Sequence, residues 1–146
     1  NSAMDGFAFA GAALGNAPLT LRNVGTAFAG KAWAGTVRPG ECLKIMTGAI
    51  MPAGLDTVVP VEFVKIDGDT VTLPPGVVKP GDNRRLLGED LMAGNAALRR
   101  GQTLGPAALG LVASLGLPSV RVFRRAKVAY FSTGDEILSL GEAPRE

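Results

Sequence analysis

The stretch DTVVPVEFVKIDGDTVTL, residues 56–73, contains the clearest signal for β-structure in this sequence. Two runs rich in β-branched residues flank Asp67-Gly68, and a glycine accepts the positive φ that a tight hairpin turn requires. Pro60 cannot donate a hydrogen bond to a neighbouring strand, so we expect it at a sheet edge or at a bulge. These residues predict antiparallel β-structure.

The flanking sequence extends the β pattern in both directions. Residues 19–38 mix apolar and polar side chains at short spacing between glycines, which favours short strands with bends. Pro39-Gly40 predicts a turn before the alternating run at 42–45. Residues 74–105 contain repeated glycine-centred turns and are interpreted as short strands and loops of the same compact domain. The fold class expected is mainly β (α+β), with a glycine-rich small β domain.

Residues 106–116, PAALGLVASLG, predict a short helical segment. Pro106 suits the first helical turn, and Gly116 suits the position just past the helix end. Because nearly all of these residues are apolar, we expect the helix to be buried or to pack against another segment or subunit.

The run VAYF, residues 128–131, is continuously apolar and predicts a strand buried on both faces. The polar loop STGDE follows at 132–136, as is usual where the first strand of an α/β domain ends. Too few residues follow to complete a parallel sheet, and the sequence does not begin with Met. We therefore expect a truncated α/β domain, within a longer protein from which both ends are cut.

Composition and charge narrow the function classes. The 146 residues are 47% hydrophobic and 19% charged, as in ordinary globular proteins. A net charge of +2 does not favour nucleic-acid binding, and the basic cluster at 121–127 is interpreted as a solvated edge. No window approaches 18 apolar residues, so no membrane association is expected. With one cysteine and no histidine, an intramolecular disulfide, a classical zinc site and a histidine-activated nucleophile are excluded within this chain, and a cytoplasmic location is expected.

Four glycine-containing stretches concentrate polar side chains, and each also has a purely structural explanation. NSAMDG (1–6) fits an Asp-Gly turn, and IMTGA (45–49) fits a capped strand end. RRLLGED (84–90) offers arginines for an oxyanion, or a surface salt-bridge cluster. STGDE (132–136) offers groups for Mg²⁺ and phosphate, or the cap of a helix starting near Ile137.

The order of these blocks is NSAMDG, IMTGA-x-x-P-x-G-x-D-x-VV, G-x-N-x-R-x-x-GED and STGDE. It resembles the molybdopterin molybdenumtransferase family, which includes bacterial MoeA and the E domain of gephyrin, over nearly the whole chain. The resemblance implies insertion of molybdate into adenylylated molybdopterin with Mg²⁺, in a cytoplasmic homodimer with four domains per subunit. It also implies three segments: the small β domain at 1–95, the returning part of an elongated linker domain at 96–125, and the start of the α/β domain that binds the pterin nucleotide at 126–146.

The resemblance carries functional roles to Asp5, Thr47, Arg85, Asp90 and Glu136. Asp5 and Glu136 would hold Mg²⁺ or orient the oxyanion, and Thr47 would hydrogen-bond a phosphate or molybdate oxygen. Arg85 would neutralise phosphate or molybdate charge, with Asp90 fixing its guanidinium. The first set, Asp5, Thr47 and Glu136, would be catalytic, and Arg85 with Asp90 would bind substrate.

Two other functions stay compatible with the sequence. One is a non-catalytic module for dimerisation or partner docking, and the other is a generic β-rich nucleotide-binding domain. The presence of all five polar positions favours the enzyme. Most of the nucleotide pocket would lie outside these residues, so we expect the 146 residues alone to be inactive. The resemblance further implies that the small β domain of one subunit faces the α/β domain of the other.

Overall fold

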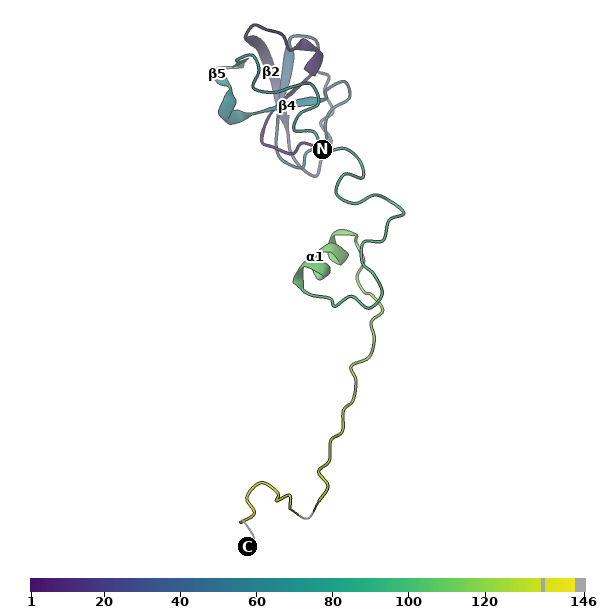
Figure 1. Ribbon diagram of the computed structural model, residues 1–146. Helices are drawn as coiled ribbons and strands as arrows, with labels where there is room; N and C mark the ends of the chain where they lie inside the picture. Colours follow the sequence, from purple (N-terminus) through teal and green to yellow (C-terminus); the bar gives the residue numbers. More distant parts are fainter. Residues whose placement is uncertain (135, 144–146) are drawn as a thin grey trace. The chain divides into compact units, whose positions relative to one another are not determined.

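The computed structural model describes residues 1–134 and 136–143 (Figure 1). The chain divides into two compact units, Asn1–Asn95 and Ala96–Glu146, and each is described by itself. The elements are β1 (Gly6–Phe9), a 3₁₀ turn η1 (Gly11–Ala13), β2 (Leu19–Ala27), β3 (Glu41–Ile45), β4 (Thr57–Pro60), a second 3₁₀ turn η2 (Val61–Phe63), β5 (Lys65–Asp67), β6 (Thr70–Leu73) and the helix α1 (Pro106–Ser114).

Unit Asn1–Asn95 is built on one six-stranded sheet with the order β4-β1-β3-β2-β6-β5. Its neighbouring strands are antiparallel except β2 and β3, which run parallel. The β2–β3 register shifts between Asn23 and Thr26, so β2 contains a bulge there. The mainly β prediction is confirmed.

The hairpin predicted from residues 56–73 joins β5 to β6. Asp67 pairs with Thr70, so the two turn residues are Gly68 and Asp69, one position later than the Asp67-Gly68 pair. Gly68 has a φ of 58°, the positive value that the first residue of such a turn requires. Pro60 ends the edge strand β4, where its missing N–H leaves no gap in the sheet. Both predictions are confirmed.

The central strands are buried on both faces, because alternate side chains enter different apolar clusters. In β1, Phe7 and Phe9 enter the first cluster and Ala8 enters the second. Burial also raises the pKa of the Cys42 thiol to about 12, so this cysteine acts as a small apolar core residue. The first cluster contains Phe7, Phe9, Leu21, Cys42, Val59, Val71, Leu73 and Val78, and the second contains Ala8, Ala27, Leu43, Ile45, Ala49, Leu55 and Val58.

Residues 74–105 form loops and turns, which corrects the expectation of short strands there. The pairing described in this stretch is a single isolated bridge between Ser2 and Arg84. Glycines with φ between 81° and 90° recur along it, at Gly76, Gly81 and Gly88. A left-handed residue every few positions interrupts the extended backbone that a strand needs, so the glycine spacing accounts for the loops.

The helix predicted at 106–116 is confirmed with both of its ends. Pro106 begins α1, and Gly116 lies just past its end with a φ of 72°. The N–H of Gly116 donates to Ala113 O at 2.9 Å, and that of Leu117 donates to Val112 O at 3.3 Å, which is the Schellman arrangement. Within the described residues only Val112 of this helix is buried. None of the helices described within 1–134 and 136–143 is long and apolar enough to cross a membrane.

The strand predicted at 128–131 is wrong for this structure. The run forms no strand, and Val128, Tyr130 and Phe131 are 84%, 93% and 85% exposed. A strand needs a neighbour for its N–H and C=O groups, and no other described segment pairs with this one. The possible helix near Ile137 is also absent from 136–143, and Asp135 lies outside the described residues.

Candidate functional site

The first three residues lie between the two loops that carry Thr47, Arg85 and Asp90, three of the candidate site residues. On one side they exchange two backbone hydrogen bonds with loop 46–49, and on the other they make three main-chain hydrogen bonds with residues 83–85. The motifs at 1–6, 45–49 and 84–90, far apart in the sequence, are thereby joined in one place. The five bonds run from Ser2 N to Ala49 O (2.9 Å), Gly48 N to Ser2 O (2.9 Å), Ala3 N to Asn83 O (2.9 Å), Arg85 N to Asn1 O (2.8 Å) and Asn1 N to Arg85 O (3.0 Å).

Asp5 and Thr47 form a close polar contact in this region. They come together because Asp5 precedes β1, Thr47 follows β3, and Gly6 pairs with Ile45 across those strands. The Thr47 N–H donates to Asp5 Oδ1 at 2.7 Å, and the Thr47 hydroxyl donates to the same oxygen at 2.6 Å. The hydroxyl bond first, and then the backbone bond, hold the pKa of Asp5 below its ordinary value. Asp5 is therefore an exposed, ionised carboxylate with a fixed orientation.

The two Thr47 bonds leave the other oxygen of Asp5 open. Oδ2 accepts no hydrogen bond from the described residues, so it can face a cation or a donor. A hydroxyl has one hydrogen, and that of Thr47 is donated to Asp5. In this arrangement Thr47 orients Asp5, and it can accept but cannot also donate to an oxyanion.

Arg85 and Asp90 also contact each other, on the loop that follows the bridge to Ser2. Arg85 Nη1 lies 3.2 Å from Oδ1 and 3.0 Å from Oδ2 of Asp90. Both side chains are at least half exposed, so the ion pair contributes little to stability. The loop is shaped instead by Glu89, whose carboxylate accepts the N–H of Leu86 at 2.9 Å. The pair borders a hollow of about 410 Å³, and the remaining Arg85 donors are available to an anion there.

Glu136, the fifth predicted residue, lies in the other unit. It is an exposed residue of a turn within Ala96–Glu146, which is described separately from the unit that holds Asp5. The structure thus brings together Asp5 with Thr47 and Arg85 with Asp90, while the relation of Glu136 to them stays a prediction.

The free carboxylate oxygen of Asp5 is suited to be one ligand of a magnesium ion. Mg²⁺ in proteins often takes one or two carboxylates and completes its shell with water and substrate phosphates. Asp5 Oδ2 supplies one such oxygen. No group of three or more His, Cys, Asp or Glu able to hold a metal occurs among the described residues, so this chain offers no self-sufficient metal site in the part that the structure describes.

Asp56, which belongs to the second motif, is a structural residue here. Its Oδ1 accepts the N–H of Gly11 at 2.7 Å and the hydroxyl of Thr57 at 2.9 Å. The bond from Gly11 is the main reason that the pKa of Asp56 is lowered. Asp56 therefore fixes the turn after β1 to the start of β4.

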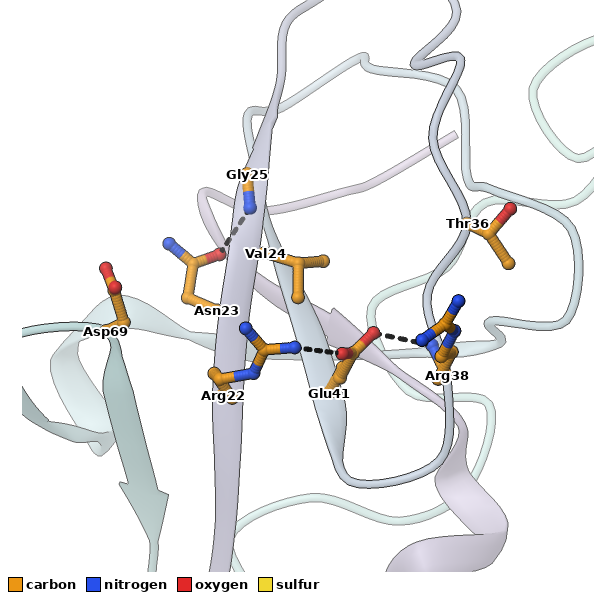
Figure 2. Close-up of a pocket in the computed structure, with 8 residues that line it drawn as sticks. All are labelled: Arg22, Asn23, Val24, Gly25, Thr36, Arg38, Glu41 and Asp69. Carbon is orange, nitrogen blue, oxygen red and sulfur yellow. Dashed lines mark hydrogen bonds and ion pairs between the residues drawn. The ribbon is translucent and has the colours of Figure 1, made fainter.

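Sequence reasoning missed a second polar hollow, beside β2 and the start of β3 (Figure 2). Its residues include Arg22, Arg38 and Glu41. The signal that could have found it is the Pro39-Gly40 turn. In that turn Gly40 has a φ of 82° and the N–H of Glu41 donates to Arg38 O, so an arginine and a glutamate are held side by side.

Comparisons with known proteins agree with the motifs. Residues 1–116 match the family described as the MoeA N-terminal region (domain I and II). The chain is 39% identical over 142 residues to the molybdopterin molybdenumtransferase of Haemophilus influenzae, covering 97% of this chain and 35% of that protein. It is 40% identical over 146 residues to molybdopterin molybdenumtransferase 2 of Mycobacterium tuberculosis, covering 97% and 36%.

A solved structure has a similar fold. The crystal structure of the molybdopterin biosynthesis MoeA protein from Pyrococcus horikoshii superimposes with a TM-score of 0.70 at 29% identity, covering 99% of this chain and 38% of that one. The chain spans just over a third of the length of these relatives. The family match, the relatives and the shared fold agree, and the chain belongs to the MoeA family, whose N-terminal region it matches.

Proposed function

We propose that this chain is part of an enzyme of molybdenum cofactor biosynthesis that inserts molybdate into adenylylated molybdopterin. The observation that carries the proposal is the convergence of two polar pairs, Asp5–Thr47 and Arg85–Asp90, on the segment formed by residues 1–3. One pair presents an oriented carboxylate and the other presents a guanidinium. A substrate that combines a pterin phosphate with an oxyanion can bind a guanidinium directly and a carboxylate through Mg²⁺.

Each residue then has a role that follows from its contacts. Arg85 binds a phosphate or molybdate oxygen through the donors that Asp90 leaves unused, and Asp90 limits the orientations of the guanidinium. Asp5 orients the reacting groups through its free oxygen, and Thr47 holds Asp5 in its ionised form. The proposal assigns the remaining acid, Glu136, to the same site from the partner subunit of a cytoplasmic homodimer.

Magnesium is the metal that we propose for this site, held by Asp5 and Glu136. When bound, it would offset the negative charge of phosphate and molybdate oxygens. The residues of this chain would orient those oxygens.

The test is an assay of molybdate insertion by the full-length protein. Asp5→Asn keeps the shape of the side chain and removes its charge, and we expect a loss of roughly a hundredfold or more in rate. Asp67→Asn makes the same chemical change at an exposed position of β5 and should leave the rate unchanged. Wild-type activity of Asp5→Asn in a folded protein would contradict the proposal.

A docking module is the second candidate, and exposed apolar side chains beside Arg85 favour it. Leu86, Leu87 and Met92 are 60%, 106% and 59% exposed. If docking were the sole role, Leu87→Ser would abolish subunit or partner association while Asp5→Asn left that association unchanged.

A further inference from the structure

A polar hollow of about 700 Å³ lies beside the middle of β2 and the start of β3 (Figure 2). β3 has five residues and is therefore about 13 Å long, with Glu41 at its first position and Thr47 beyond its last. The hollow and the Asp5–Thr47 pair thus lie at opposite ends of β3. The hollow is lined by Arg22, Asn23, Val24, Gly25, Thr36, Arg38, Glu41 and Asp69.

Glu41 fixes the two arginine-bearing segments around this hollow. Its Oε1 pairs with Arg22 Nη2 on β2, and its Oε2 accepts the backbone N–H of Arg38 at 2.8 Å (Figure 2). The Glu41 side chain is only 11% exposed, and both of its oxygens are occupied. Glu41 therefore serves as an internal anchor and offers little to a ligand.

The bulge in β2 adds a further donor to the same wall. Asn23 Oδ1 accepts the N–H of Lys44 at 3.0 Å and that of Gly25 at 3.4 Å, in place of regular ladder bonds at the shifted register. With the amide oxygen used in this way, the Asn23 side-chain nitrogen is left with its two hydrogens.

The hollow consequently has an excess of hydrogen-bond donors. Arg22 uses one guanidinium nitrogen for Glu41, and the Arg38 guanidinium makes no hydrogen bond or ion pair with the described residues. Thr36 adds a hydroxyl. In Figure 2 the one further carboxylate, Asp69, lies on the far side of Arg22 from Arg38. Figure 2 also shows the Glu41 carboxylate between Arg22 and Arg38, so a ligand would use the guanidinium donors that Glu41 does not occupy.

We infer that this hollow is a binding site for an anionic oxygen-bearing group, a phosphate or a carboxylate, held by the guanidinium donors of Arg22 and Arg38 that Glu41 leaves unused. Arginine forks match the planar or tetrahedral oxygen geometry of both groups. Two arginines and two carboxylates line the hollow, so its formal charge is zero and we expect dissociation constants in the millimolar range, on the order of 1–10 mM. The inference uses none of the residues of the proposed enzyme site.

The experiment is a titration of the 146-residue chain, followed by two-dimensional amide NMR spectra at constant ionic strength. The probes are sodium phosphate, sodium acetate and sodium chloride in separate arms. We expect saturable shifts at Asn23, Gly25, Thr36 and Arg38 with phosphate, acetate or both, and none with chloride. The arm that saturates identifies whether phosphate, carboxylate or both are accepted.

Three variants make the result specific. Arg38→Gln removes the guanidinium but keeps the backbone bond to Glu41, and should weaken binding about tenfold. Lys79→Gln removes the same charge at an exposed position and should change the dissociation constant less than twofold. Asp69→Asn should tighten binding several-fold. Non-saturating shifts in both arms, shifts centred on Thr47 or Arg85, or equal effects of Arg38→Gln and Lys79→Gln would each overturn the inference.

Discussion

The two units contain similar apolar side chains but bury them to different extents. Phe9 and Val59 are fully buried in Asn1–Asn95, whereas Tyr130 and Phe131 are 93% and 85% exposed in Ala96–Glu146. In the first unit β1 pairs with β3 and β4, which lie more than thirty residues further along the chain. In the second unit the one regular element among the described residues, α1, satisfies its backbone locally. In this protein the buried core forms where distant segments also supply backbone partners for the strands.

The largest contrast should come from matched phenylalanine truncations in the two units. Phe9→Ala removes a fully buried ring and should lower the free energy of unfolding of the first unit by about 3–5 kcal/mol. Phe131→Ala removes an exposed ring and should change it by less than about 0.5 kcal/mol. Urea titration followed by fluorescence of the single tryptophan, half-buried Trp33, reports on this unit. If Phe9→Ala abolishes folding, Phe9→Leu should lower the free energy of unfolding by a smaller, measurable amount. Equal effects of Phe9→Leu and Phe131→Ala would contradict the expected difference between buried and exposed rings.

Replacing glycine by alanine should lower the stability of the first unit and raise the stability of the helix in the second. A Cβ at Gly6 would collide with the carbonyl oxygen of Val59 across β1 and β4, so Gly6→Ala should cost about 1–3 kcal/mol. A Cβ at Gly110 meets open space within α1, so Gly110→Ala should favour the helix by roughly 0.5–1 kcal/mol. Urea titration measures the first, and hydrogen exchange of the α1 amides measures the second. A stable Gly6→Ala protein would show that β1 and β4 can separate without loss.

The difference between local backbone structure and contacts of distant segments also explains which features could be predicted from the sequence. The hairpin at Gly68, the edge position of Pro60 and the helix end at Gly116 depend on local backbone chemistry, and the prediction was right. The strand order and the parallel β2–β3 pair depend on contacts between distant residues, for which the sequence has no local signal. The prediction of a strand at 128–131 failed because a continuous apolar run describes a strand only when its neighbours are present.

The candidate site shows the same limit. The resemblance to a family, rather than any spacing, led to Asp5 and Thr47. The hydroxyl bond that turns Thr47 toward Asp5 could not be read from the motif. Residues 1–3 join three motifs through backbone bonds, and such bonds leave no trace in side-chain identity. The hollow around Arg38 was missed because its two arginines and Glu41 belong to no recognised motif.

Mixed dimers of the full-length protein test whether Asp5 of the first unit and Glu136 of the second serve one site from different subunits. Asp5→Ala and Glu136→Ala should each be inactive alone. In a mixed dimer one site carries both changes and the other carries neither. With equal random mixing about half of the dimers are mixed, so activity should recover to about a quarter of that of the wild type, provided that the sites act independently.

Subunit exchange must be verified separately, for example with two differently tagged chains. If exchange occurs and activity stays at the level of the single variants, Asp5 and Glu136 do not serve a shared site across subunits. Asp5 would then act within its own subunit or serve only as a turn residue.

The smallest expected effect is on the pKa of Asp5. It tests whether an exposed side chain of the first unit is held in a fixed orientation. The folded-state pKa of Asp5 lies below the ordinary value of 3.8, chiefly because of the Thr47 hydroxyl. Ionised Asp5 therefore stabilises the fold above pH 3.8, and this contribution is lost as the pH falls through the folded-state pKa. Thr47→Val removes the hydroxyl but keeps the backbone bond, so the pKa should rise toward 3.8, whereas Thr47→Ser should preserve it. An NMR titration of the Asp5 carboxyl carbon measures the pKa directly. Identical values for Thr47→Val and Thr47→Ser would mean that the hydroxyl does not hold Asp5 in solution, and that the carboxylate of this site is oriented by the backbone alone.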